Sequence, residues 1–200
     1  MPRTFTAELS FPYAWPQTAL GVLHKYPNEH AQHVVSLDVL SQDYDPISRQ
    51  VRLERILGVK QGAPKWAMRA LGGDNVTYVR EVMVVDPVRK RVEMTSTNMS
   101  LSKYLMVKEY ITYEPSTFAS SSLPTSPGAA AQPAAPSPPP TSTGASSTTF
   151  RQVAGISSDS FLGASAIEDW SFSRFGDNAG RGRQGLMSVL HRLWGPAESA

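Results

Sequence analysis

Residues 75–114 read NVTYVREVMVVDPVRKRVEMTSTNMSLSKYLMVKEYITYE, and their pattern predicts the centre of a sheet. Its segments 75–86, 91–100 and 105–114 are rich in β-branched and aromatic residues, which favour strands. The dipeptide Asp86-Pro87 between the first two segments is typical of a turn. Because the connections are short, we expect the three strands to form an antiparallel meander.

The flanking sequence adds further strands and two helices. Strands are expected over 3–10, 33–40, 51–55 and 150–156. A short helix is expected to open at Trp15-Pro16, since proline is favoured in a first turn, and a long one to span 167–193. This order predicts an α+β fold with a curved antiparallel sheet of about seven strands. A long helix laid across such a sheet would enclose a ligand cavity.

Composition excludes several classes of function. The chain has 200 residues, with 19 Lys plus Arg against 17 Asp plus Glu and a net charge of +2. So small an excess of positive charge does not suggest nucleic acid as a partner. The chain has no cysteine, which excludes disulfides, zinc–thiolate sites and a cysteine nucleophile.

One segment differs from the rest in composition. No charged residue occurs between Pro115 and Phe150, where Pro, Ala, Ser, Thr and Gly dominate. Such a segment buries too little apolar surface to offset the conformational entropy lost on ordering it, so we expect it to be disordered. We interpret 116–148 as a loop insertion within a single domain, 1–200. An interdomain linker is the alternative, although about fifty residues would be a small second domain.

No membrane-spanning or cleavable segment is expected. The sequence after Met1 shows neither an apolar signal stretch nor an Arg-rich amphipathic one. The longest aliphatic run, Val82 to Val85, is too short to cross a bilayer.

The usual catalytic and cofactor motifs are missing. Residues 180–185 read GRGRQG, but no expected strand precedes them as a phosphate-binding loop requires. His30 and His33 would suit a metal only on one helix, and the Pro27-Asn28 turn argues against that. We therefore expect no metal and no cofactor. With no nucleophile, base and orienting group to nominate together, the sequence favours a binding protein over an enzyme.

The C-terminal helix carries a polar stripe. Arg174, Asn178 and Arg181 are spaced so that they share one helical face. The stripe is either a solvated surface or a set of groups that project into a cavity and hold an anionic head group. Arginine suits the second role because its planar guanidinium binds phosphate bidentately.

The segment 60–71 mixes cations with apolar side chains between Gly and Pro positions. Its members of interest are Lys60, Pro64, Lys65, Trp66, Met68 and Leu71. Aromatic and apolar tips among cations suit a segment that enters an anionic membrane interface. Alternatively, Trp66 and Leu71 fill the domain core.

Many short motifs, in order, carry a family resemblance. They include Lys25-Tyr-Pro-Asn28, His33-Val34, Glu54-Arg-Ile56, Val59-Lys-Gln-Gly62, Pro64-Lys-Trp66, Val79-Arg-Glu-Val82, Tyr113-Glu-Pro115 and Glu168-Asp-Trp-Ser171. With these motifs the chain resembles the PRELI-like (Ups-type) lipid-transfer family, and most of all its slowmo-type branch.

The resemblance implies a fold and a function. The fold would be a lipid tunnel similar to START-like and phosphatidylinositol-transfer domains. Members carry anionic phospholipids between the outer and inner mitochondrial membranes, across the intermembrane space. They work as heterodimers with a small helical protein of the twin Cys-x9-Cys type. The slowmo-type branch is associated with phosphatidylserine and its sister branch with phosphatidic acid.

Site residues follow from matching positions. The resemblance implies that the lipid head group is bound by Lys25, His33, Arg174, Asn178 and Arg181. It also implies that the segment with Trp66 is a lid over the tunnel mouth. Val59, Gly62 and Ala63 stand where members can be basic, which leaves room for a serine head group. Phosphatidic acid transfer, and a non-enzymatic scaffold that binds the helical partner, remain alternatives.

Overall fold

The computed structural model describes residues 3–60, 76–100, 102, 105–116, 147–157 and 164–197. Within these ranges the side chains of Arg3, 164–171 and 173–179 lie outside the description. The elements follow one another as β1 (Arg3–Phe11), α1 (Trp15–Leu23), the 3₁₀ turn η1 (Glu29–Ala31), β2 (Val34–Tyr44), β3 (Val51–Lys60), β4 (Val76–Asp86), β5 (Arg91–Asn98), β6 (Met106–Pro115), β7 (Thr148–Ser157) and α3 (Ala164–Trp194).

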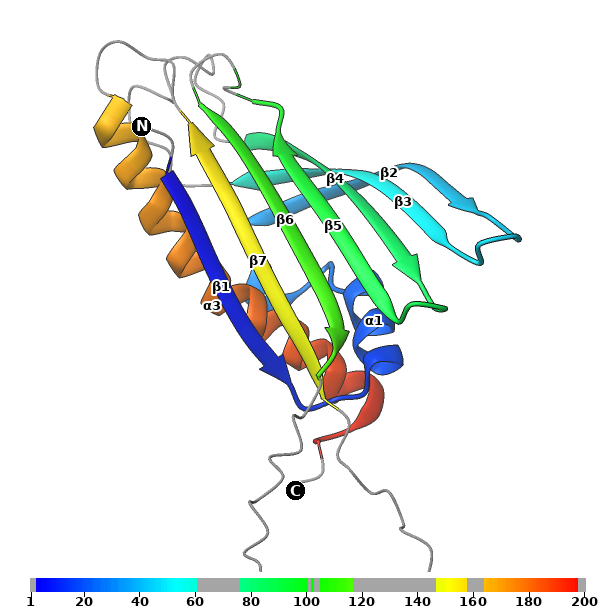
Figure 1. Cartoon of the computed structure of the whole chain (residues 1–200). Helices are drawn as coiled ribbons and strands as arrows, with labels where there is room; N and C mark the ends of the chain where they lie inside the picture. The colour runs from blue at the N-terminus through cyan, green and yellow to red at the C-terminus, as the bar shows by residue number, and fades with distance from the viewer. Residues whose placement is uncertain are drawn as a thin grey trace, which may run out of the picture.

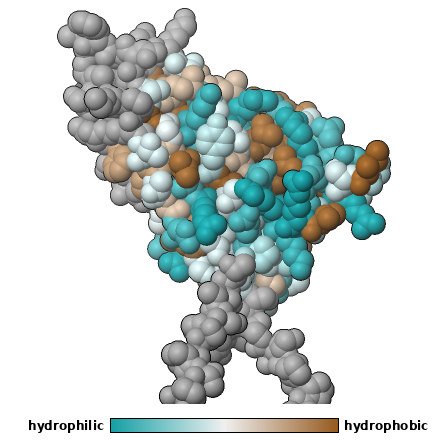
Figure 2. Space-filling view, in the orientation of Figure 1, coloured by the Kyte–Doolittle hydropathy of each residue, from teal (hydrophilic) through white to brown (hydrophobic). Residues whose placement is uncertain are grey.

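The strands form one antiparallel sheet in the order β1-β7-β6-β5-β4-β3-β2. Both α1 and α3 lie on the same side of this curved sheet (Figure 1). The opposite face, seen in Figure 2, is largely hydrophilic. The expected α+β architecture, its seven strands and the meander from β4 to β6 are confirmed.

Alternation along each strand separates the two faces. In β6, Ile111 and Tyr113 are buried, whereas the intervening Thr112 is only half-buried and Tyr110 is exposed. The inward residues of β3 to β7 meet both helices in one core, which contains Phe11, Trp15, Val22, Met83, Val92, Met94, Tyr113, Phe150, Leu186 and Leu190. No helix among the described residues is long and apolar enough to cross a membrane.

The segment between β6 and β7 begins and ends at neighbouring positions. The amide of Ser116 donates to the carbonyl of Ser147 at 2.8 Å, and Pro115 pairs with Thr148. Residues 117–146 lie outside the described residues, so the disordered insertion stays a prediction.

The long C-terminal helix is confirmed, and it is continuous through its glycines. A Cβ at Gly185 would lie 3.2 Å from Asn28 Oδ1. This glycine therefore lets α3 approach the segment that follows α1.

Candidate functional site

A cavity of about 260 Å³ lies between the inner face of the sheet and α3. The side chains that line it come from β1, from the segment after α1, from β4 to β7 and from α3. Its apolar lining includes Leu9, Phe11, Ala31, Val79, Met94, Leu105, Val107, Ile111 and Phe150. The cavity expected between sheet and helix is thus present, and it is largely apolar.

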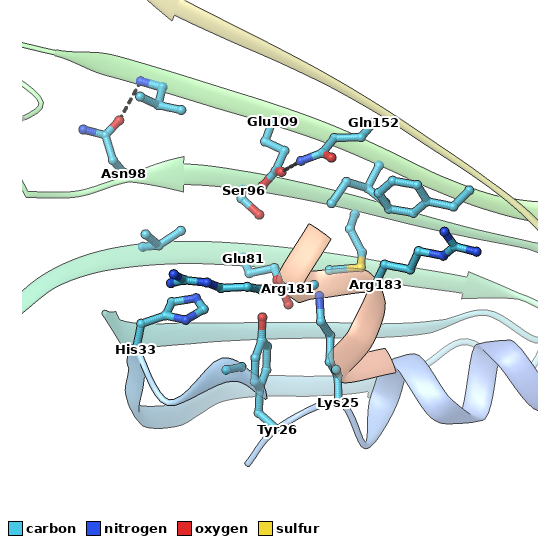
Figure 3. Close-up of a pocket in the computed structure, with 18 of the residues that line it drawn as sticks. Lys25, Tyr26, His33, Glu81, Ser96, Asn98, Glu109, Gln152, Arg181 and Arg183 are labelled. Carbon is cyan, nitrogen blue, oxygen red and sulfur yellow. Dashed lines mark hydrogen bonds between the residues drawn. The ribbon is translucent and has the colours of Figure 1, made fainter. Parts of the chain in front are cut away.

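Lys25 enters this cavity from the segment after α1 (Figure 3). Its ammonium lies 5.4 Å from the centre of the Tyr26 ring and close to Gly182 of α3. The segment is fixed by Asn28, whose Nδ2 donates to the carbonyl of Gly185 at 2.7 Å. Packing of this segment against a glycine-bearing helix therefore sets the position of Lys25.

Electrostatic interactions keep Lys25 charged. Burial alone opposes the ammonium form, but the phenols of Tyr26 and Tyr113 and the carboxylates of Glu81 and Glu109 raise the pKa of Lys25 above its ordinary value. The cavity therefore holds a positive charge at neutral pH.

His33 and Arg181 join Lys25 at the cavity (Figure 3). Burial, followed by the charges of Arg181 and Lys25, lowers the pKa of His33. Its imidazole is therefore neutral at pH 7 in the unliganded protein. Arg181 is exposed at the cavity edge, where its guanidinium remains available for an anion.

Three of the five head-group residues expected from sequence thus line one cavity: Lys25, His33 and Arg181. The other two, Arg174 and Asn178, lie on α3, but their side chains are outside the described residues. Arg183 also lines the cavity and was not expected.

A row of polar side chains crosses the inner face of the sheet beside these cations. Arg55 of β3 pairs in register with Glu81 of β4, Glu81 with Ser96 of β5, and Ser96 with Glu109 of β6. Gln152 of β7 completes the row by contacting Glu109. We call these five residues the polar row.

The first pair of the polar row is a buried ion pair. Nε of Arg55 lies 2.5 Å from Oε1 of Glu81, and the two side chains are 2% and 7% exposed. The guanidinium of Arg55 also lies 5.6 Å from the centre of the Tyr26 ring. Tyr26 therefore connects this ion pair with Lys25, whose ammonium lies near the same ring.

At the other end of the polar row, the carboxylate of Glu109 contacts a neutral side chain instead of a cation. The amide nitrogen of Gln152 donates to Oε1 of Glu109, as Figure 3 shows. Burial raises the pKa of Glu109, while hydrogen bonds from Gln152 and Ser96 and the charge of Lys25 act in the opposite direction. No cation among the described residues forms an ion pair with this carboxylate.

Comparison with known proteins identifies the family. A model of the PRELI-like family matches residues 18–123, which is more than half of the chain. "Protein UPS2, mitochondrial" of Saccharomyces cerevisiae is 35% identical over 190 residues, covering 94% of this chain and 72% of that protein. The chain belongs to the PRELI-like family.

Other PRELI-like relatives agree. "UPS-like protein C36.10" of Schizosaccharomyces pombe is 30% identical, covering 92% of this chain and 86% of that protein. "Protein slowmo homolog" of Dictyostelium discoideum is 24% identical, covering 100% of this chain and 76% of that protein. The resemblance to the Ups and slowmo branch is confirmed, and the relative UPS2 is named as mitochondrial.

Solved structures share the fold at low sequence identity. TTHA0849 from Thermus thermophilus superposes with a TM-score of 0.59 at 9% identity, covering 96% of this chain and 99% of that one. Ara h 8.0201 superposes with a TM-score of 0.51 at 10% identity, covering 95% of this chain and 99% of that one. These likenesses confirm the expected START-like fold.

Of the lid residues expected in this PRELI-like chain, the structure describes only Lys60. It ends β3 and is exposed, and its amide donates to the carbonyl of His33 at 2.7 Å. Pro64, Lys65, Trp66, Met68 and Leu71 lie outside the described residues. Because Lys60 is hydrogen-bonded to His33, the last residue of β3 lies next to the cavity lining.

The sequence pattern gives no role to the polar row. Glu54-Arg-Ile56 and Val79-Arg-Glu-Val82 contain two of its members but serve only as family motifs. The available signal was alternation, because Glu109 shares its parity with the apolar residues Val107 and Ile111. A charged residue at an inward position of a strand marks a buried polar site.

Proposed function

We propose that this protein carries one phospholipid at a time between the outer and inner mitochondrial membranes, across the intermembrane space. The cargo is phosphatidylserine or a related anionic phospholipid, with phosphatidic acid as the alternative. Membership of the PRELI-like family supports lipid transfer as the class of function. No covalent step is part of the proposal.

The observation that carries the proposal is a largely apolar cavity at which Lys25, His33 and Arg181 meet. Burying an acyl chain is favourable by about 0.8 kcal/mol for each methylene, which suits the apolar walls. A phosphate taken out of water without partners would cost far more than this gain supplies. Cations at the same cavity remove that obstacle, so one lipid can satisfy both parts of the lining.

Three further elements belong to the proposal. Arg174 and Asn178 complete the head-group site on α3. The segment from Lys60 to Leu71 opens as a lid at an anionic membrane and closes in water. A small helical protein of the twin Cys-x9-Cys type is the heterodimer partner, and co-purification of the two chains tests this.

A liposome-to-liposome transfer assay with the partner co-expressed tests the function. We expect selective transfer of labelled phosphatidylserine or phosphatidic acid over phosphatidylcholine. Arg181→Glu should abolish transfer and leave the circular dichroism spectrum unchanged, because Arg181 is exposed. The matched control is Arg192→Glu, an exposed position of the same helix outside this cavity.

The outcomes separate the alternatives. Transfer by Arg181→Glu at the wild-type rate would contradict the head-group assignment. A folded complex that transfers no lipid, and that purifies without lipid, would favour the scaffold function instead.

A further inference from the structure

The polar row contains two carboxylates in different situations. Glu81 is engaged by Arg55 at 2.5 Å, so its charge is compensated within the sheet. Glu109 accepts hydrogen bonds from two neutral groups, the amide of Gln152 and the hydroxyl of Ser96, and has no ion-pair partner among the described residues. Both Glu109 and Gln152 line the cavity.

We propose that Glu109 and Gln152 form a receptor for the primary ammonium group of the lipid head group. The cargo is then an aminophospholipid, whose head group carries a phosphate and a primary amine together. This inference rests on the proposed lipid-transfer function and narrows its substrate class.

Gln152 supplies an unused hydrogen-bond acceptor. Its side chain is 6% exposed, and its amide nitrogen is directed at the carboxylate of Glu109. Beside an ionised Glu109, the reverse amide orientation would place two acceptors together, so the oxygen points elsewhere. That oxygen, Oε1, is buried and has no hydrogen-bond partner among the described residues. A buried acceptor without a donor is costly, and a ligand that donates removes the cost.

An ammonium group matches both neighbours. It has three N–H donors and a compact positive charge, so it can donate to Glu109 and to Gln152 Oε1 at once. Burial raises the pKa of Glu109, and an ammonium beside it stabilises the charged carboxylate. A phosphate oxygen at this position would instead meet two hydrogen-bond acceptors and a negative charge.

The anion site and the amine site belong to one cavity. Lys25, His33, Glu109 and Gln152 all line it (Figure 3). The cavity therefore presents both cations and a carboxylate, which match the phosphate and the amine of one head group. Phosphatidic acid lacks the amine, and phosphatidylcholine lacks N–H donors.

Phosphatidylserine and phosphatidylethanolamine share this chemistry, and the assay separates them. Labelled forms of both are compared with phosphatidylglycerol, an anionic lipid without an amine, in the co-expressed complex. We expect wild-type protein to transfer at least one aminophospholipid about tenfold faster than phosphatidylglycerol, the effect of one charged hydrogen bond. Glu109→Gln should remove this preference.

The matched control is Glu114→Gln on the same strand. Glu114 lies on the outer face of β6, where it pairs with Arg91 and Arg151, and it does not line the cavity. We expect this variant to keep the wild-type lipid preference. A preference for the amine that survives Glu109→Gln would overturn the inference.

A measurement on the wild-type protein does not depend on the folding of a variant. Phosphatidylserine is compared with its N-trimethylated derivative, which keeps every charge and loses the N–H donors. Equal transfer of the two lipids would overturn the amine receptor while leaving lipid transfer intact. Failure to transfer any lipid would instead overturn the proposed function and this inference with it.

Discussion

The inner face of the sheet has two ends, and the polar row separates them. At one end Met83, Val92 and Tyr113 are buried against α1 and α3 in the main core. At the other end a small cluster contains Leu105 and Ile156, with Val107 packed beside them. The cavity reaches both ends, since its lining includes Met94 and Ile111 of the main core as well as Leu105 and Val107.

The difference shows that stability and ligand binding use the same kind of residue. An inward aliphatic side chain stabilises the fold where helix side chains cover it, and lines the cavity where they do not. Ile111 and Phe150 serve both purposes, since they belong to the main core and also line the cavity.

The largest expected effect is at the boundary itself. Arg55→Met leaves Glu81 buried without its cation, so we expect a loss of about 3–5 kcal/mol in the free energy of unfolding. Urea denaturation measures it. The double variant Arg55→Met/Glu81→Met should recover most of the loss, since no charge is then left unpaired. Wild-type stability of Arg55→Met would contradict the view that Arg55 compensates the buried charge of Glu81.

The next effect compares the two ends directly. Leu190→Ala removes a side chain that is 0% exposed in the main core, so we expect a loss of about 3 kcal/mol. Val107→Ala at the cavity end should cost about 1 kcal/mol, because its surroundings are less filled. Urea denaturation measures both losses of stability. Relative to its loss of stability, Val107→Ala should lose more activity in the transfer assay than Leu190→Ala. Equal losses of stability would remove the distinction between the two ends.

A smaller effect distinguishes two glycines of α3. Gly180→Ala should stabilise the protein by about 0.5–1 kcal/mol, because alanine favours a helix and nothing lies within 4 Å of the new Cβ. Gly185→Ala should instead destabilise it by about 1 kcal/mol, since its Cβ would press on Asn28, which is held by hydrogen bonds. Thermal unfolding measures both changes. Displacement of Asn28 should also slow lipid transfer, because Asn28 fixes the segment that carries Lys25.

The smallest effect concerns pH. The pKa of His33 is lowered in the folded protein by burial and by Arg181 and Lys25, so the unfolded chain binds the proton more readily. Stability from this group is therefore present above the unfolded pKa of about 6.5 and is lost as the pH falls through it toward the folded value. His33→Gln should lose less stability than wild type between about pH 7 and pH 5.5, as urea denaturation at each pH measures. A bound phosphate beside His33 should reverse the trend in wild-type protein.

Much of this arrangement is predictable from residue patterns. The strand segments, both helices and the grouping of Lys25, His33 and Arg181 follow from periodicity and from family motifs. The polar row does not, because strand register decides which residues become neighbours. Its members Arg55, Glu81, Ser96 and Glu109 lie on four different strands, and nothing local in the sequence indicates that they pair.

The pairing of β1 with β7 has a consequence for how the chain folds. Glu8 and Arg151 form an ion pair across these strands although they are 143 residues apart. The first strand therefore cannot join the sheet until nearly the whole chain is available, and such high contact order slows folding. During that interval the edges of β1 and β6 remain unpaired and prone to aggregation.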